Sequence, residues 1–468
     1  MYGPRLRSPF VVGRPWHRFR TAGYRELASG ALVLAMSLVA PSSAETLRQA
    51  FTRAFQTNPE IQAARAALEA ADYQIQVARA GSHPSVFLNG SAGRARWGVT
   101  SSLFHLVGAS LATNEYEYGI GVSQPLWQGG RITSEIRAAQ NQVSQRLAHL
   151  HEIEQRVFLS VVAAYTSVYL DQQVLGLEQH NEELLFQHLE STQARLRNGE
   201  ATRTDLAEAQ ARLEQAKSEV IAARGQLANE EARFVEVVGS KPGFLTAPAA
   251  THPLPHSLAE TEALASENFS VIAARFGIRE AHQTIETVRS AALPEIQLIG
   301  SYGRAYNPEF GFTRLNTASI LLSVSVPLYS GGVTRSRIRV ARAVLRENRE
   351  NARTVLREAL AQATQSWQRY VTAGARLRAL RSQVTAEKVA YHGVVAEHRQ
   401  GVKTLLNVLN AEQELLASEV SYVSAKAERV VAGYAIRAAV GNLTYRHIVQ
   451  PGHFTRPRTP PATTPPRS

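Results

Sequence analysis

The chain carries one sequence pattern twice, and this duplication limits the folds it can adopt more than any other feature. The segments "QPLWQGG" at 124–130 and "VPLYSGG" at 326–332 share their Pro, Leu, aromatic residue and paired Gly in the same order. An offset of 202 residues then aligns the two halves without a gap up to Gly239 and Gly441. Upstream, 63–94 aligns with 273–304 at an offset of 210. We therefore expect a tandem repeat of one structural unit.

The repeat divides the 468 residues into predicted parts with different compositions. The end of the chain is rich in Pro, Thr and Arg, a composition that cannot bury a core. We expect a signal peptide at 1–44, a first repeat at 45–239, a Pro-rich connector at 240–261, a second repeat at 262–441 and a disordered tail at 442–468.

The first 44 residues have the layout of a secretory signal peptide. Six Arg precede the apolar run Leu27–Ala40, and small residues follow it, so cleavage before Glu45 is expected. The alternative is an N-terminal core helix. Cleavage lowers the formal net charge from +12 to about +7. The remaining basic residues are scattered without an aromatic–basic motif, which argues against a nucleic-acid partner. Cysteine is absent, which excludes disulfides, thiol nucleophiles and zinc–thiolate sites.

Each repeat predicts the same order of elements. An opening helix, at Leu47–Gly81 and again at Leu264–Ala292, ends before a Pro. Alternating segments at 85–93, 115–127, 295–303 and 318–329 predict strands. Long helical patterns follow, at Arg131–Arg197 and Arg203–Val238 in the first repeat. A helix of 67 residues is about 100 Å long, far more than a globular domain needs.

The second helix of each pair carries a heptad pattern. In the first repeat an apolar residue recurs every seven positions, with Ala between. The seam of the second repeat has Arg429 as its one break. This pattern predicts helices packed as in a coiled coil. The first seam consists of Leu206, Leu213, Val220, Leu227 and Phe234.

A Pro and a Gly pair stand between each last strand and the following long helix. Pro cannot donate to a strand ladder, and Gly permits a sharp turn. We therefore expect these residues to mark where a strand becomes a helix. They are Pro125, Gly129 and Gly130 in the first repeat and Pro327, Gly331 and Gly332 in the second.

Four strands in one chain cannot close a barrel, because closed barrels need about eight strands or more. An open sheet would expose its edges, so the sequence favours strands shared among several copies. Segments of about 10–12 residues fit tilted membrane-spanning strands. Aromatic residues such as Trp127 and Tyr329 lie near their ends, where an aromatic girdle would meet the lipid boundary. A soluble sheet capped by aromatic residues is the alternative.

Two other classes of protein fit the sequence less well. For an enzyme, His149 and His151 lie in "HLHEIEQ", which is not a zinc-binding HExxH motif and places the two rings on different helix faces. "GIGVSQ" lacks the third Gly of a dinucleotide loop. We therefore expect no catalytic residues, cofactor or metal. A purely structural coiled-coil protein would explain the heptads but neither the strands nor the duplication.

Over 45–442 the sequence resembles the TolC family of outer-membrane efflux proteins. The resemblance is carried by "NPE" at 58–60, the two Pro/Gly-pair segments, and "RLRNGEATRTDLAEAQARLEQA" with "EHRQGVKTLLNVLNAEQELLAS". It implies an α+β membrane protein, a homotrimer whose twelve strands form one β-barrel in the outer-membrane lipid. The barrel would continue into a helical tunnel through the periplasm. It also implies two partners, a periplasmic adaptor (membrane fusion protein) and an inner-membrane ABC transporter.

In that family the inner end of the tunnel lies at the turns between paired helices, here Arg197–Asp205 and Arg399–Asn407. Members often carry acidic residues after the second turn, but this chain has Asn407 and Asn410 there, so we expect weaker cation selectivity. Asp205 and Glu208 stay acidic in the first repeat. Pairing with Asp205 would hold the entrance closed, and ordinary solvated turn residues are the alternative. The candidate partners are Arg203, His398, Arg399 and Lys403.

The neutral turn and the basic tail favour a protein substrate over small molecules. We expect the exit duct of a type I secretion system exporting an acidic, calcium-binding toxin of the RTX type. The sequence also looks similar to the outer-membrane components of cyclolysin exporters. The alternative is a multidrug or small-molecule efflux pump.

Overall fold

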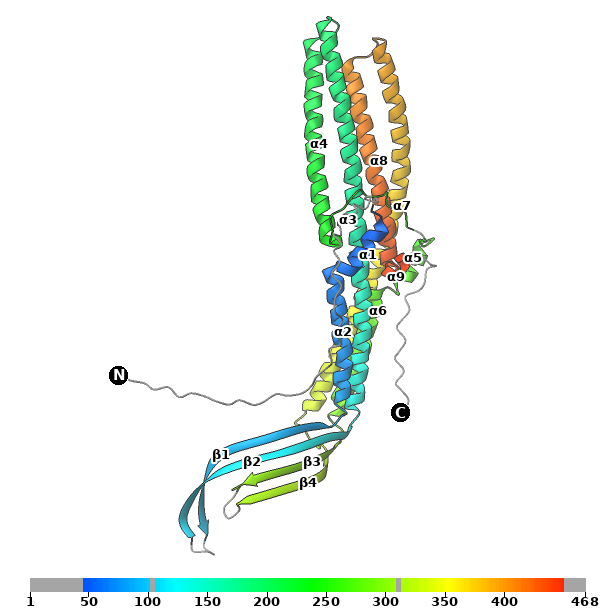
Figure 1. The fold of residues 1–468 in the computed structure, drawn as a ribbon. Helices are drawn as coiled ribbons and strands as arrows, with labels where there is room; N and C mark the ends of the chain where they lie inside the picture. Colours follow the sequence, from blue (N-terminus) through cyan, green and yellow to red (C-terminus); the bar gives the residue numbers. More distant parts are fainter. Residues whose placement is uncertain (1–44, 102–105, 252, 309–312, 450–468) are drawn as a thin grey trace, which may run out of the picture. The chain divides into compact units, whose positions relative to one another are not determined.

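The computed structural model describes residues 45–101, 106–251, 253–308 and 313–449 (Figure 1). The signal peptide predicted at 1–44 and the tail beyond 449 lie outside these residues. The elements in chain order are α1 Leu47–Thr57, α2 Pro59–Ala80, β1 Ser85–Ser101, β2 Leu106–Gln128, α3 Arg131–Arg197, α4 Arg203–Val238, α5 Leu258–Ala265, α6 Phe269–Ser290, β3 Glu295–Tyr306, β4 Arg314–Ser325, α7 Val333–Arg399, α8 Leu405–Ala439 and α9 Tyr445–Val449.

The strands form one antiparallel sheet in the order β1-β2-β3-β4, with β1 and β4 at its edges (Figure 1). The predicted four strands are therefore confirmed, but β1 and β2 extend far beyond their predicted bounds. Residues 94–101 and 106–114, which the sequence pattern did not predict as strand, continue the hairpin, and the ladder reaches Ser101 opposite Leu106. The longer hairpin lies in the first repeat, where the alignment offset changes.

Pro125 does not leave the ladder as predicted. It lies inside β2 opposite Gln297, and the register shifts between Pro125 and Trp127. A bulge at this point accommodates a residue that has no N–H to donate. In the second repeat β4 ends at Ser325, so Pro327 lies beyond the strand as expected.

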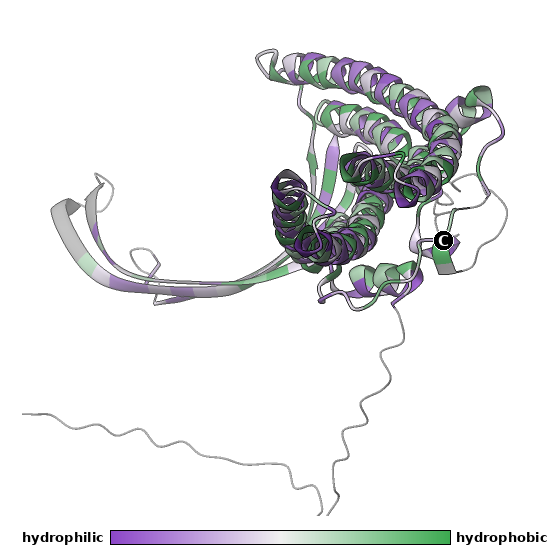
Figure 2. Ribbon diagram, turned by 90° about the horizontal axis from the view of Figure 1, so that it is seen from above, coloured by the Kyte–Doolittle hydropathy of each residue, from purple (hydrophilic) through white to green (hydrophobic). Residues whose placement is uncertain are grey.

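The long helices pack in pairs, α3 against α4 and α7 against α8, and α3 also contacts α6 and α8. α3 and α7 each contain 67 residues, about 100 Å of helix. The bounds of α3 and α4 are those that the sequence pattern predicted. Hydrophobic and hydrophilic residues are mixed along these helices (Figure 2). Among the described helices none is apolar over a length that would cross a bilayer.

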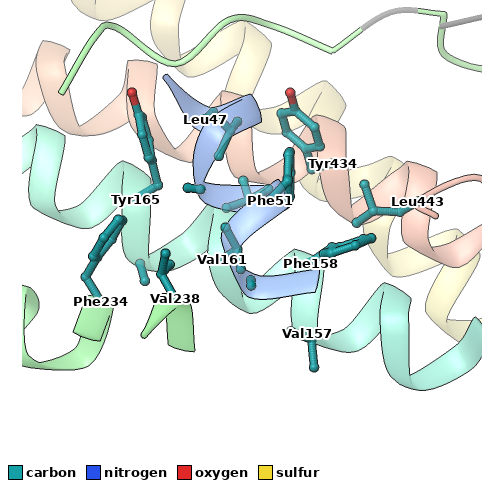
Figure 3. Close-up of a cluster of buried hydrophobic side chains, with 14 of the residues drawn as sticks. Leu47, Phe51, Val157, Phe158, Val161, Tyr165, Phe234, Val238, Tyr434 and Leu443 are labelled. Carbon is teal, nitrogen blue, oxygen red and sulfur yellow. The ribbon is translucent and has the colours of Figure 1, made fainter. Parts of the chain in front are cut away.

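A buried hydrophobic cluster joins α1 to the middle of α3, the end of α4 and the end of α8 (Figure 3). Phe158 is fully buried there, and its ring meets that of Phe51 edge-on at 5.3 Å between centroids. The hydroxyl of buried Tyr165 lies 2.7 Å from the carbonyl oxygen of Glu45 and 2.8 Å from that of Thr246. These contacts attach the first described residues to the segment after α4.

The opening helix expected at Leu47–Gly81 is two helices, because Asn58 ends α1 and caps α2. Its side-chain oxygen accepts from the amide of Glu60, and Pro59 takes the first helical position. The second copy is likewise split into α5 and α6. α5 begins at Leu258, inside the stretch expected to be connector.

The stretch expected to be a disordered tail begins with a helix, α9. The ring of Tyr445 stacks on that of Phe55 at 4.1 Å, with an angle of 4° between the planes. Ile448 also packs against the main cluster. Composition did not predict this helix, because apolar contacts of Leu443, Tyr445 and Ile448 hold a segment whose other residues are mostly polar.

Candidate functional site at the two helical turns

The turn between α3 and α4 is built around Asp205. Thr202 caps α4, and its hydroxyl accepts from the amide of Asp205 at 3.1 Å. The carboxylate of Asp205 in return accepts from the amide of Thr202 at 2.8 Å. These hydrogen bonds, with a smaller contribution from the charge of Arg195, lower the pKa of Asp205 below its usual value.

Asp205 therefore does not make the ion pair that the sequence suggested. Within the described residues, none of the four candidate partners forms an ion pair with it. These candidates are Arg203, His398, Arg399 and Lys403. The physical reason is that the third helical residue lies where its carboxylate can cap its own helix. Glu208, half-buried one turn further on, likewise has no ion-pair partner among the described residues.

The turn between α7 and α8 has the same construction with a neutral residue. The side-chain oxygen of Asn407 accepts from the amide of Thr404 at 3.1 Å and from its hydroxyl at 2.8 Å. His398 closes the turn, because its Nδ1 lies 2.8 Å from the carbonyl oxygen of Lys403. Asn407, Asn410 and Lys403 are exposed.

Each polar contact between the two turns joins a predicted residue to an arginine that the sequence did not single out. Arg212 on α4 donates to the side-chain oxygen of Asn410 on α8 at 2.8 Å. Arg195 Nη1 lies 3.3 Å from Nε2 of His398. These polar contacts flank a small apolar cluster shared by α3, α4 and α8, which consists of Leu185, Ala209, Leu213, Ala216, Leu405 and Leu409.

Behind the turns, His188 and Glu412 form a partly buried pair, with Nε2 and Oε2 separated by 3.4 Å. The Glu412 side chain is 7% exposed, and its charge adds to burial in raising the pKa of Tyr391. A charged residue between apolar Val408 and Leu416 is the signal that could have identified Glu412 from the sequence. Its partner on α3 is visible only in the fold.

The family model described as outer membrane efflux protein matches residues 51–240 and 261–442. The chain belongs to this family. The resemblance to the TolC family is thereby confirmed, as is the predicted location in the outer membrane with an extension into the periplasm. The family consists of channel proteins, which are not enzymes.

Outer membrane efflux protein BepC of Brucella suis is 30% identical over 90% of this chain and 91% of its own length. Outer membrane protein TolC of Vibrio cholerae is 24% identical over 87% of this chain and 93% of its own. Among solved structures, the CmeC outer membrane channel of Campylobacter jejuni superposes with a TM-score of 0.73. It covers 85% of this chain and 86% of its own at 16% identity, which shows the shared fold.

In this outer membrane efflux protein both Gly pairs lie between a strand and a long helix. Gly129 and Gly130 have φ of 58° and 80°, and Gly331 and Gly332 have φ of 59° and 81°. All four values lie in the left-handed region, which only Gly adopts at low cost. α3 and α7 begin at the residue after each pair.

Farther from the turns, carboxylates face each other between α3 and α4 of the efflux protein. Burial and the charge of Glu230 raise the pKa of Asp171 to about 6, and a hydrogen bond from Gln226 lowers it in part. Burial and the charge of Glu219 raise the pKa of Glu178. Glu178 and Glu219 line a cavity of about 360 Å³ between α3, α4 and α8.

Asp171→Asn is expected to stabilise the protein at pH 7.5. The native pKa of about 6 exceeds the ordinary 3.8, so the native state binds more protons between these values and stability falls as pH rises through them. Allowing for solvent screening, we expect a gain of about 1 kcal/mol at pH 7.5 and a flatter stability profile from pH 4 to 6. Thermal unfolding across this pH range measures both.

Exposed Glu236 on α4 provides the control. Glu236→Gln removes one carboxylate outside the pair and should change the unfolding midpoint at pH 7.5 little. Equal stabilisation by both variants would mean that overall charge, not the Asp171–Glu230 pair, governs the pH dependence.

Proposed function

We propose that this channel protein is the exit duct of a tripartite type I secretion system that exports a protein. The observation that carries the proposal is the junction of a four-stranded sheet, open at β1 and β4, with helices of about 100 Å. Pairing of the β1 edge of one copy with the β4 edge of the next would remove both edges. Three copies would close the twelve-stranded barrel that the family resemblance implies, continuous with a helical tunnel.

The proposed partners are a periplasmic adaptor and an inner-membrane ABC transporter. The two helical turns are the proposed entrance, because they lie at the ends of α3 and α7 opposite the strands. The polar contacts of Arg212 with Asn410 and of Arg195 with His398 would hold neighbouring helix pairs together there. Arg212 and Arg195 thus replace Arg203 and Lys403 as the proposed closing residues.

The proposed substrate is an acidic protein of the RTX type. Exposed Asn407 and Asn410 leave the second turn of each copy without a carboxylate, so the entrance repels an acidic chain less than if both turns were acidic. Alkaline protease secretion protein AprF of Pseudomonas aeruginosa, named for secretion, is 27% identical over 62% of this chain. BepC is named for efflux, which supports small-molecule efflux as the second candidate.

Single-channel conductance of the mature protein in a planar bilayer tests the channel and its entrance together. Long-lived openings with weak ion selectivity are expected. Asn407→Asp with Asn410→Asp should increase cation selectivity, measured as a shift in reversal potential under a salt gradient. Asn410→Asp alone should increase cation selectivity less than the double substitution, because Arg212 donates to this position at 2.8 Å and would offset the new charge.

Asp205→Asn provides the opposite change at the matching position of the first repeat and should reduce cation selectivity. A reversal potential that is the same in all these variants would place the constriction elsewhere. A mature protein that remains monomeric and never conducts would contradict the duct itself.

A further inference from the structure

A stripe of arginines runs along the first third of α7. Seven arginines follow one another at spacings of 4, 3, 4, 3, 4 and 4 residues, which keep their side chains on one face of the helix. All seven are exposed. This arginine stripe consists of Arg335, Arg339, Arg342, Arg346, Arg349, Arg353 and Arg357.

The stripe is not used in the packing of α7. Ala341 and Leu345 make the buried contact with Ala281 and Ile285 of α6. Arg353 pairs with Glu350 at 2.8 Å, but no carboxylate among the described residues pairs with the other six arginines. Like charges three and four residues apart destabilise a helix, so the stripe opposes folding unless an anion meets it.

The stripe belongs to the second repeat alone. The offset of 202 residues aligns the seven arginines with seven residues of α3, of which one is Arg and most are neutral. The architecture that the two repeats share therefore does not require the stripe. The matching residues are Thr133, Arg137, Gln140, Ser144, Leu147, His151 and Gln155.

We propose that the arginine stripe is a binding surface for an acidic polypeptide that lies along α7. From Arg335 to Arg357 the stripe covers about 33 Å of helix, which an extended chain of roughly 10 residues would match. A small anion would meet only one or two arginines. Guanidinium groups bind carboxylates with two parallel hydrogen bonds, so a chain rich in Asp and Glu would engage them in series.

A lipid surface fits the stripe less well. The headgroup layer is about 5–8 Å deep on each side of the hydrocarbon. α7 begins at Val333, directly after the Gly pair that follows β4. A helix leaving the membrane there would carry most of the stripe beyond the reach of phosphate groups.

The test measures binding of a fluorescent peptide of about 12 residues, alternating Glu and Gly, to the full mature protein by anisotropy. A Lys–Gly peptide is the control ligand. Arg339→Gln, Arg342→Gln and Arg346→Gln together should weaken Glu–Gly binding about tenfold, and added salt should remove the difference. The matched control changes three exposed arginines of α7 outside the stripe, Arg369→Gln, Arg378→Gln and Arg381→Gln, and should change affinity less than about twofold.

A charge-reversal variant distinguishes loss of the binding surface from loss of the folded structure. Arg339→Glu, Arg342→Glu and Arg346→Glu together should gain affinity for the Lys–Gly peptide, which a misfolded protein would not do. The proposal would be overturned if both Gln triples weakened Glu–Gly binding equally. It would also be overturned if neither triple weakened this binding. A stripe variant that loses binding to vesicles of anionic phospholipid yet keeps its peptide affinity would contradict it as well. Because conductance is measured separately, a conducting protein that fails to bind contradicts this inference and leaves the duct intact.

Discussion

Phe158→Ala is expected to lower the free energy of unfolding by about 3–5 kcal/mol. Phe158 is fully buried in the cluster that joins α1 to α3 (Figure 3). The substitution removes an edge-on contact with Phe51 and a tilted contact with Phe55, whose centroid lies 6.2 Å away. Well-packed surroundings relax only partly, so a cavity remains. The midpoint of thermal unfolding of the mature protein in detergent measures the loss.

Phe186→Ala is the matched control on the same helix. The Phe186 side chain is 46% exposed, so its truncation leaves no enclosed cavity and should cost less than about 1 kcal/mol. Equal losses at the two positions would mean that the cluster at α1 does not hold the helices together as its packing indicates.

Gly129→Ala is the second substitution with a large expected effect, a loss of roughly 2–4 kcal/mol. A Cβ at this position would lie 2.7 Å from Cβ of Leu293 and 3.0 Å from the carbonyl oxygen of Ser290. Both neighbours lie at the junction of α6 with β3, where little can move aside. The left-handed φ of 58° adds strain for any residue with a side chain. The yield of folded protein in the outer membrane and the thermal midpoint measure the effect.

Gly331→Ala separates the two causes. Gly331 has nearly the same φ, 59°, but an added Cβ would meet no atom within 4 Å. This variant should show only the backbone strain, about 1 kcal/mol. If Gly331→Ala is as damaging as Gly129→Ala, contact with α6 does not distinguish the first strand-to-helix junction from the second.

The sequence alone determined the features that depend on neighbouring residues. Periodicity predicted α3 and α4 at their observed bounds and the presence of four strands, because each pattern reports which face a local element buries. The Gly pairs likewise stand where their left-handed φ is needed. The same local reading failed at Asn58, where the capping side chain of one residue divides a continuous apolar pattern into two helices.

The tertiary structure decided which distant residues meet. Pro125 stays in the ladder because β3 continues opposite it. α9 is held in place because the ring of Tyr445 stacks on that of Phe55. At the turns, position along the chain suggested that Asp205 pairs with nearby cations. In the fold, Asp205 instead caps its own helix by accepting from the amide of Thr202, and Arg212 donates to Asn410. Such pairings depend on how helices far apart in sequence are aligned along their lengths, and one chain's local pattern does not specify that alignment.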